Sequence, residues 1–250
     1  MSTAHPTTVI TGGSRGIGRA IALRLAAEGH NVVLGYTSDA EAAEGVVAEI
    51  RALGRGCHAY RVDIADAASV RAFFATASEL TELGTEFGPI TGVVANAGAI
   101  RATGPLVELD PADIEADLRV NLLGTILTCQ AAIPVLAKSR GSIVTIGSAA
   151  VASGSPNTYV HYAAAKAGVA VFTEGLAREL APQGIRVNCV EPGTVWTAFH
   201  EDPERPAQVA ERIPLGRAGQ PDEIAGAVAW LLSSDAAYAT GANIRVAGGL

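Results

Sequence analysis

The chain has 250 residues, of which 49% are hydrophobic and 17% are charged. A chain of this length can bury a substantial core as one large domain, and this composition excludes an intrinsically disordered protein. The formal net charge is −7, from 18 basic and 25 acidic residues, and no basic patch stands out, so we do not expect a nucleic-acid partner.

The cysteines and the N-terminus indicate the cellular compartment. Cys57, Cys129 and Cys189 are widely spaced, which fits neither a CxxC metal or redox motif nor a disulfide framework. Buried, reduced thiols of this kind are typical of a cytoplasmic protein. Residues Met1–Thr8 are polar and lack the apolar region of a signal peptide, and we expect no window with the uninterrupted apolar length of a membrane helix.

Strand-like and helix-like patterns alternate along the chain, which predicts an α/β fold with a mostly parallel sheet. Strands are predicted at Thr8–Thr11, Asn31–Gly35, His58–Val62, Gly92–Ala95, Ser142–Ile146, Arg186–Glu191 and Asn243–Val246. Helices are predicted at Gly18–Glu28, Asp39–Leu53, Asp66–Glu82, Pro111–Ala137 and Tyr159–Leu180. No linker or repeat divides the chain, so residues 1–250 are expected to form a single domain. The irregular segment Thr194–Gly219 is interpreted as a substrate lid or, alternatively, an ordinary surface excursion.

A glycine-rich run joins the first strand to the first helix, with the spacing G-x-x-x-G-x-G. Glycines let the backbone approach a phosphate closely, and a helix N-terminus offers free N–H groups and a partial positive charge. Strand, turn and helix in this order predict a dinucleotide-binding site, with a purely structural turn as the alternative. The residues of the run expected to contact the cofactor are Gly12, Ser14, Arg15, Gly16, Ile17 and Gly18.

The end of the second strand favours NADP(H) over NAD(H). An acid there would bind the ribose 2′-hydroxyl and select NAD(H). Here the strand is followed by Tyr36, Thr37 and Ser38, and the first acid is Asp39. Thr37 or Ser38 can donate hydrogen bonds to a 2′-phosphate, and Arg15 can pair with it unless Arg15 is a solvated loop cation. We therefore expect NADP(H) as cofactor and keep NAD(H) as a possibility.

Two further strand ends carry candidate cofactor contacts. Asp63 and Ile64 follow the third strand, where a carboxylate can accept a hydrogen bond from the adenine amino group or can cap the next helix. Asn96, Ala97 and Gly98 end the fourth strand. A short amide with small neighbours there can hold the sheet geometry and admit a ribose, and a plain turn is the alternative.

Tyr162 and Lys166 lie four residues apart within the predicted helix Tyr159–Leu180, with Ser148 upstream. Helical spacing puts the two side chains on one face. An ammonium beside a phenol favours the phenolate, so Lys166 is expected to lower the pKa of Tyr162. Such a tyrosine can exchange a proton with a carbonyl oxygen.

These motifs, in this order and spacing, resemble the short-chain dehydrogenase/reductase (SDR) family over nearly the whole chain, and most of all its 3-oxoacyl-carrier-protein reductase type. The resemblance implies a Rossmann-type, doubly wound parallel sheet of seven strands flanked by helices. It also implies an NADP(H)-dependent oxidoreductase that transfers a hydride between nicotinamide and a carbonyl or secondary alcohol, and a likeness to enzymes that are usually homotetramers. No metal site and no membrane association are expected.

The same resemblance assigns roles to residues. Tyr162 would be the general acid in reduction, Lys166 would lower its pKa and bind the nicotinamide ribose, and Ser148 would hold the substrate oxygen. Asn121 would bend its helix and hold a water that links Lys166 to solvent. The residues that would contact the nicotinamide carboxamide or the diphosphate are Pro192, Gly193, Val195 and Thr197.

Several positions leave alternatives open. The loop between Ser148 and Tyr162 is expected to be longer than usual for the family. Glu191 is interpreted as a solvated side chain or a contact to a polar substrate, and His161 as a surface residue. Trp196 and Phe199 would form an apolar pocket wall or pack within the lid.

The leading hypothesis is an NADP(H)-linked ketoreductase. An NAD-linked sugar, polyol or alcohol dehydrogenase of the same fold is the alternative, and a non-catalytic nucleotide-binding protein is a third. Specificity should depend on Ile100–Gly104, Val151–Thr158 and the lid. The nearby residues Glu191, His200, Glu201 and Asp202 do not favour a polyanionic substrate, and no basic cluster marks a docking site for an acidic carrier protein.

Overall fold

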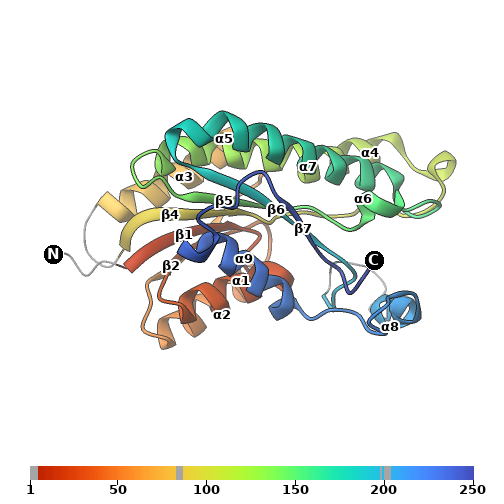
Figure 1. Ribbon diagram of the computed structural model, residues 1–250, viewed down its shortest axis with the longest axis horizontal. Coiled ribbons are helices and arrows are strands. Elements are labelled where there is room, and N and C mark those ends of the chain that lie inside the picture. Colours follow the sequence, from red (N-terminus) through yellow and green to blue (C-terminus); the bar gives the residue numbers. More distant parts are fainter. Residues whose placement is uncertain (1–4, 83–86, 198, 200–203) are drawn as a thin grey trace.

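The computed structural model describes residues 5–82, 87–197, 199 and 204–250 (Figure 1). The strands are β1 His5–Thr11, β2 Asn31–Tyr36, β3 Cys57–Arg61, β4 Phe87–Ala95, β5 Ser142–Ile146, β6 Arg186–Pro192 and β7 Asn243–Val246. The α-helices are α1 Gly16–Ala27, α2 Ala40–Ala52, α3 Ala67–Glu82, α4 Pro111–Leu118, α5 Gly124–Leu136, α6 Ala150–Ser153, α7 Val160–Leu180, α8 Arg205–Val209 and α9 Pro221–Leu232.

Short helical turns complete the chain. They are η1 Leu106–Glu108, η2 Arg119–Leu123, η3 Ala181–Gln183, η4 Ala210–Arg212 and η5 Ser234–Ala236. The strands form a single sheet in the order β3-β2-β1-β4-β5-β6-β7, and every pair is parallel. The strand order reverses between β1 and β4, which leaves a crevice at the carboxyl ends of these strands. The predicted doubly wound sheet of seven strands is confirmed.

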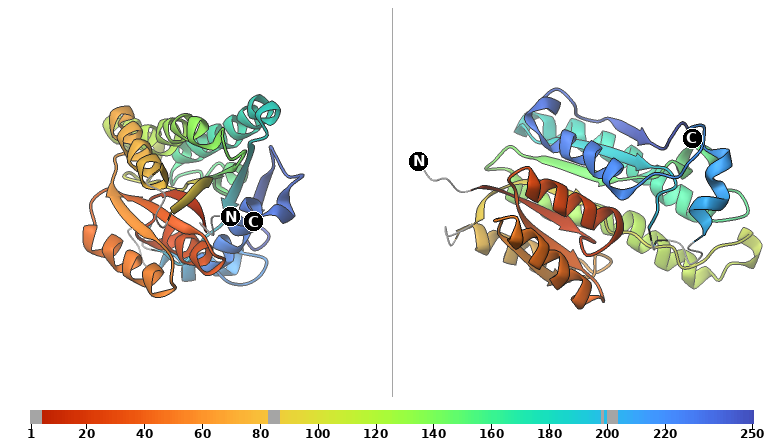
Figure 2. Two further views of the ribbon diagram at one scale, coloured as in Figure 1. Left: turned by 90° about the vertical axis from the view of Figure 1, so that its left-hand side faces the viewer. Right: turned by 90° about the horizontal axis from the view of Figure 1, so that it is seen from below.

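Helices cover both faces of the sheet, as Figures 1 and 2 show: α1, α2 and α9 on one face, and α3, α4, α5 and α7 on the other. Side chains of the central strands alternate between two core clusters. Ile10 packs with α1 and α9, whereas its neighbour Val9 packs with α3 and α5. Because both faces are buried, these strands read as continuous apolar runs in the sequence.

The structure adds one long helix that the sequence analysis did not predict. Helix α9 begins with Pro221 at its first turn, and the Glu223 carboxylate accepts a hydrogen bond from the Gln220 backbone N–H at 2.8 Å. Both are helix-start signals, so this helix was detectable from the sequence. Its buried face, which includes Ile224 and Val228, packs against α1 in the core.

The predicted helix Pro111–Ala137 is not continuous. A π-helical turn, η2, separates α4 from α5, and Asn121 lies buried within it. The stretch Pro111–Leu136 is long and apolar enough to cross a membrane by length and composition, contrary to the sequence expectation. In the fold, α5 directs Cys129, Ala132 and Leu136 into the core between the sheet and its neighbouring helices.

Candidate active site

A cleft of about 930 Å³ lies at the carboxyl ends of the strands. Its walls include residues that directly follow four strands, namely Gly12, Asn96, Gly147 and Gly193. The predicted site residues that line it are Gly12, Ser14, Arg15, Gly16, Ile17, Gly18, Tyr36, Thr37, Ser38, Asp63, Ile64, Asn96, Ala97, Gly98, Ser148, Tyr162, Lys166, Pro192, Gly193, Val195 and Thr197. Asn121 is buried behind this wall and hydrogen-bonds Ala99, which lines the cleft.

The glycine loop has the geometry of a phosphate cradle. Gly12 and Gly16 have φ of +67° and +54°, in the left-handed region that side chains disfavour. A Cβ on Gly18 would lie 2.0 Å from the Gly12 carbonyl oxygen, so only glycine fits there. The first turn of α1 contains no acidic residue, which keeps its N-terminus positive. Backbone N–H groups at this end can therefore bind a pyrophosphate.

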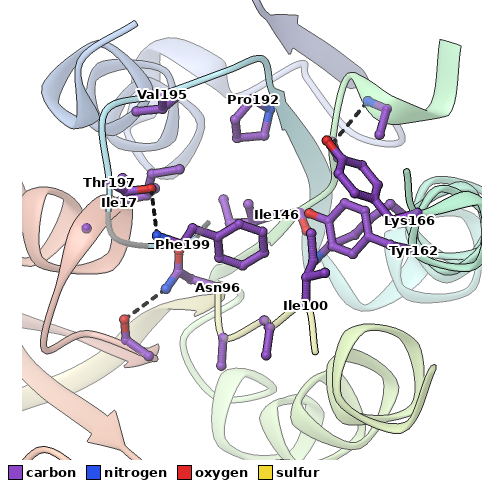
Figure 3. Close-up of a pocket in the computed structure, with 18 of the residues that line it drawn as sticks. Ile17, Asn96, Ile100, Ile146, Tyr162, Lys166, Pro192, Val195, Thr197 and Phe199 are labelled. Atoms are coloured by element: carbon purple, nitrogen blue, oxygen red, sulfur yellow. Dashed lines mark hydrogen bonds between the residues drawn. The ribbon is translucent and has the colours of Figure 1, made fainter. Parts of the chain in front are cut away.

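Asn96 holds the glycine loop against the sheet. Its amide nitrogen donates to the carbonyl oxygens of Thr11 at 2.9 Å and Gly12 at 3.0 Å (Figure 3). The backbone N–H groups of Asn96 and Ala97 donate to the Thr11 hydroxyl at 3.1 and 3.2 Å. The interpretation that this amide holds the sheet geometry is confirmed.

The cleft wall at the end of β2 has no acid before Asp39. Tyr36 ends β2, Thr37 and Ser38 follow it, and all three line the cleft. Asp39 also lines it, but its carboxylate caps α2 by accepting the Ala42 N–H at 2.9 Å.

The Asp63 side chain stabilises its own loop. It accepts the Ala65 N–H at 2.9 Å, whereas α3 is capped by Asp66, which accepts the N–H groups of Ala68 and Ser69. Asp63 is therefore not the cap of α3, and it lines the cleft beside Ile64.

Tyr162, Ser148 and Lys166 meet at the other end of the cleft. Tyr162 and Lys166 are 7% and 3% exposed, and the Lys166 Nζ lies 5.7 Å from the Tyr162 ring centroid. Nζ donates to the Ile146 carbonyl oxygen at 2.8 Å, while the Ser148 hydroxyl accepts the Ala150 N–H at 3.1 Å. Ser148 belongs to the segment that leads into α6, the short helix within the long loop expected here.

Burial is the largest cause of the pKa shifts of both Tyr162 and Lys166. It raises the pKa of Tyr162 above 10.0, and the neighbouring Ser148 hydroxyl partly offsets this effect. Burial also lowers the pKa of Lys166 to about 8. The net direction of the Tyr162 pKa shift is upward because desolvation of the phenol is its largest cause, and the lowering expected from Lys166 stays a prediction.

Asn121 and Asp117 hold the wall segment 99–101. The Asn121 amide donates to the Ala99 carbonyl oxygen at 2.6 Å and to that of Asp117 at 2.9 Å, and its oxygen accepts the Ala99 N–H. Both oxygens of the Asp117 carboxylate accept the Arg101 N–H at 3.1 Å. Asn121 lies in the π-helical turn η2, consistent with the expected bend in its helix.

Two sequence interpretations are corrected by burial. His161 is 6% exposed rather than a surface residue, and its Nε2 pairs with the Asp117 carboxylate at 2.9 Å. Glu191 is 4% exposed and is neither solvated nor part of the cleft wall. Its carboxylate accepts two hydrogen bonds of 3.2 Å from Arg245 on the adjacent strand β7, so it pairs two strands of the sheet.

The segment after β6 turns across the mouth of the glycine loop. A Cβ on Gly193 would lie 2.7 Å from the Ala247 Cα, which explains the glycine. Val195 forms a bridge with Gly219. The Thr197 side chain lies against Gly16, 3.3 Å from where a Cβ on that glycine would be. This segment therefore brings Val195 and Thr197 to the cleft beside the N-terminus of α1.

Phe199 and Trp196 have different positions. Phe199 lines the cleft with its ring centroid 6.0 Å from that of Tyr162, and Figure 3 shows the two rings on facing sides of the pocket. Trp196 does not line it and is 39% exposed. The segment Thr194–Gly219 contributes further lining residues that were not singled out from the sequence, among them Arg205, Val209 and Arg212. His200, Glu201 and Asp202 lie outside the described residues.

Among the described residues, no group of three or more His, Cys, Asp or Glu side chains is arranged to hold a metal ion. The three cysteines are free and buried, and burial raises the pKa of Cys129 to about 12.

Comparison with known proteins places the chain among oxidoreductases. A family model described as enoyl-(acyl carrier protein) reductase matches residues 12–250. The chain is 40% identical over 248 residues to the uncharacterized oxidoreductase YgfF of Escherichia coli K12, with 96% of this chain and 98% of that protein covered. It is 39% identical over 247 residues to the 3-oxoacyl-[acyl-carrier-protein] reductase FabG of Staphylococcus aureus Mu50, with 98% and 97% covered.

A solved structure matches at the level of the whole fold. It is a short-chain dehydrogenase of Burkholderia cenocepacia J2315 in complex with NADP, with a TM-score of 0.90 and 36% identity over 100% of this chain and 99% of that one.

Proposed function

This chain belongs to the short-chain dehydrogenase/reductase family of oxidoreductases, and we propose that it is an NADP(H)-dependent ketoreductase with Tyr162 as its general acid and base. The observation that carries this proposal is the meeting of Tyr162, Ser148 and Lys166 at one end of a cleft whose other end is a glycine cradle. All three groups needed for proton transfer to a carbonyl are present, which argues against a non-catalytic nucleotide-binding role.

The residues fit an NADP(H) molecule. The left-handed glycines and the α1 N-terminus would hold the diphosphate, and Asp63 and Asn96 line the adenosine and ribose side. Arg15 lines the cleft beside Tyr36–Ser38, with no carboxylate there except the helix-capping Asp39, so a 2′-phosphate would meet a cation. The similarity to the NADP complex of the Burkholderia protein supports the same choice.

Bound NADPH would supply the hydride, and the protein would hold the carbonyl and provide the proton. Ser148 would donate to the substrate oxygen and stabilise its developing charge. The Tyr162 phenol is protonated at neutral pH and would donate its proton to that oxygen in reduction.

Lys166 and Asn121 would support this transfer. Lys166 would orient the nicotinamide ribose and keep a positive charge near Tyr162, and Asn121 would hold the wall segment through Ala99. We also propose that Asn121 holds a water that links Lys166 to solvent. The segment Pro192–Thr197, in particular Gly193, Val195 and Thr197, would contact the nicotinamide carboxamide or the diphosphate.

Substitution of Tyr162 by Phe tests the proposal. It removes only the hydroxyl, so NADPH consumption with a ketone panel should fall by about 10²–10⁴-fold while NADPH binding is retained. Turnover at the normal rate in Tyr162→Phe would exclude the assigned role.

The cofactor choice has its own test. Removal of a charged contact to the 2′-phosphate costs about 1.5 kcal/mol or more, so Arg15→Met should weaken NADPH binding roughly tenfold. NADH binding, measured by the same fluorescence titration, should change little. Tighter binding of NADH than NADPH by the unmodified protein would instead favour the NAD-linked sugar, polyol or alcohol dehydrogenase.

We further propose that the enzyme is a cytoplasmic homotetramer. Exposed apolar side chains on the outer helices, namely Leu118, Leu123 and Val171, are compatible with packing between subunits. Light scattering coupled to size-exclusion chromatography measures the assembly, and a monomer at micromolar concentration would contradict it.

A further inference from the structure

Three arginines besides Arg15 are among the residues that line the cleft, namely Arg101, Arg205 and Arg212. Of these, Arg205 contacts Tyr159, which packs against Tyr162 at the acid–base end of the site. The acids among the described lining residues are Asp39 and Asp63, and both follow strands at the adenosine end. In a chain with a net charge of −7, arginines in the described cleft wall, apart from the two acidic side chains that line it, favour an anionic group on the substrate.

Arg205 is the arginine best placed to meet that group. It begins α8, at the same end of the molecule as α6 (Figure 1), and its Nη2 donates to the Tyr159 hydroxyl at 3.0 Å. The guanidinium carbon lies 5.4 Å from the Tyr159 ring centroid. The Tyr159 ring in turn lies edge-on to the Tyr162 ring, with centroids 5.4 Å apart and an interplanar angle of 85°. Arg205 thus contacts Tyr159, and Tyr159 in turn contacts the acid–base tyrosine.

The Nε of Arg205 is buried and has no hydrogen-bond partner among the described residues. None of the ion pairs found among the described residues includes Arg205, Arg101 or Arg212. A buried donor without a partner is unfavourable, and a guanidinium binds a carboxylate through paired N–H groups better than any other side chain does.

Resting on the proposed ketone reduction, we propose that Arg205, steadied by Tyr159, binds the carboxylate of the substrate, and that the substrate class is a short-chain oxo acid. The Arg205 guanidinium carbon and the Tyr162 ring centroid each lie 5.4 Å from the Tyr159 ring centroid, so only a few carbons fit between the substrate carbonyl and its carboxylate. In the reaction, the carbonyl carbon takes the hydride of NADPH and its oxygen takes the proton of Tyr162. The product is a hydroxy acid and NADP⁺, and the carboxylate is unchanged.

A structural role is the competing explanation, because the Arg205–Tyr159 hydrogen bond also joins the lid helix α8 to the start of α7. The two roles differ in their effect on charge. Loss of a hydrogen bond that only joins the two helices would alter the reduction of acidic and neutral ketones alike, whereas loss of a carboxylate contact would affect only the acidic ketones.

Matched pairs of probes separate these roles. NADPH oxidation by the full chain is measured with 4-oxopentanoate and 5-oxohexanoate and with their methyl esters. We expect the unmodified protein to prefer at least one acid over its ester in kcat/KM, and Arg205→Met to reduce that preference tenfold or more, mainly through the KM of the acid. Arg205→Lys should retain part of the preference, and Tyr159→Phe should have an intermediate effect. Arg178→Met, at an exposed position on α7, is the matched control and should leave the preference intact.

Binding is measured in parallel as the shift in melting temperature of the NADPH-loaded protein with each acid. An equal loss for acid and ester in Arg205→Met, or no preference in the unmodified protein, would overturn the carboxylate site while leaving ketone reduction in place. Arg205-dependent binding of an acid without turnover of any probe would retain the site and refute the proposed reduction. Absence of both binding and turnover would overturn the inference.

Discussion

The buried His161–Asp117 pair offers the sharpest test of how the active-site wall is held. His161 directly precedes Tyr162, and its Nε2 hydrogen-bonds the Asp117 carboxylate at 2.9 Å, with both side chains almost fully buried. The same carboxylate accepts the Arg101 N–H. His161→Leu keeps a similar volume but removes the donor, which leaves the buried carboxylate with the Arg101 N–H as its remaining partner in the described structure.

The expected cost follows from this loss. A hydrogen bond to a charged group contributes about 1.5–3 kcal/mol, and a buried polar group left without its partner costs about 1–3 kcal/mol. We therefore expect His161→Leu to lower the free energy of unfolding by about 3 kcal/mol. For a chain of this size, that corresponds to a melting temperature lower by about 6–12 °C.

Urea unfolding followed by circular dichroism, at one fixed protein concentration, measures the effect. His161→Gln is the matched control, because its amide can still donate to Asp117, and it should cost about 1 kcal/mol or less. In the double variant Asp117→Asn/His161→Leu, the losses should be non-additive by more than about 1 kcal/mol, since the two groups share one interaction. A loss below about 0.5 kcal/mol for His161→Leu, or additive losses, would refute the reasoning.

Two further predictions concern the cofactor cradle and the acid–base site. Gly18→Ala places a methyl group 2.0 Å from the Gly12 carbonyl oxygen, so it should weaken NADPH binding at least tenfold in a fluorescence titration. Gly45→Ala on α2 is the control, because the added methyl group meets nothing within 4 Å; this variant should bind NADPH normally and be more stable by about 0.5–1 kcal/mol. Normal NADPH binding by Gly18→Ala would contradict the proposed phosphate cradle. Because burial lowers the pKa of Lys166 to about 8 but raises that of Tyr162, kcat/KM for reduction should fall about tenfold per pH unit above pH 8 as Lys166 loses its proton while Tyr162 keeps its own. A pH profile that stays flat to pH 9.5 would remove the need for a charged Lys166. The free energy of unfolding should depend on pH as well. Burial of the charged Lys166 lowers stability below pH 8, and stability should rise as pH increases from about 8 to 10.5 because the buried lysine is then neutral.

The amino-acid sequence alone determined the features that depend on local pattern. The glycine run between a strand and a helix, the absence of an acid before Asp39, and the four-residue spacing of Tyr162 and Lys166 each follow from short-range geometry. Apolar runs separated by helical periodicity were enough to predict the seven strands and the parallel sheet, because βαβ units restrict how such elements connect. Helix α9 was missed although Pro221 and Glu223 marked its start.

Only the tertiary structure decided which polar groups are buried and what they contact. His161 hydrogen-bonds Asp117, 44 residues away in the sequence, and Glu191 accepts hydrogen bonds from Arg245, 54 residues away. No local sequence pattern could therefore identify these residues as buried pairs. The direction of the Tyr162 pKa shift also depends on burial of the phenol, which the four-residue spacing of Tyr162 and Lys166 does not reveal. The tertiary structure likewise decided the position of Arg205, because only folding brings it to Tyr159, 46 residues away in the sequence.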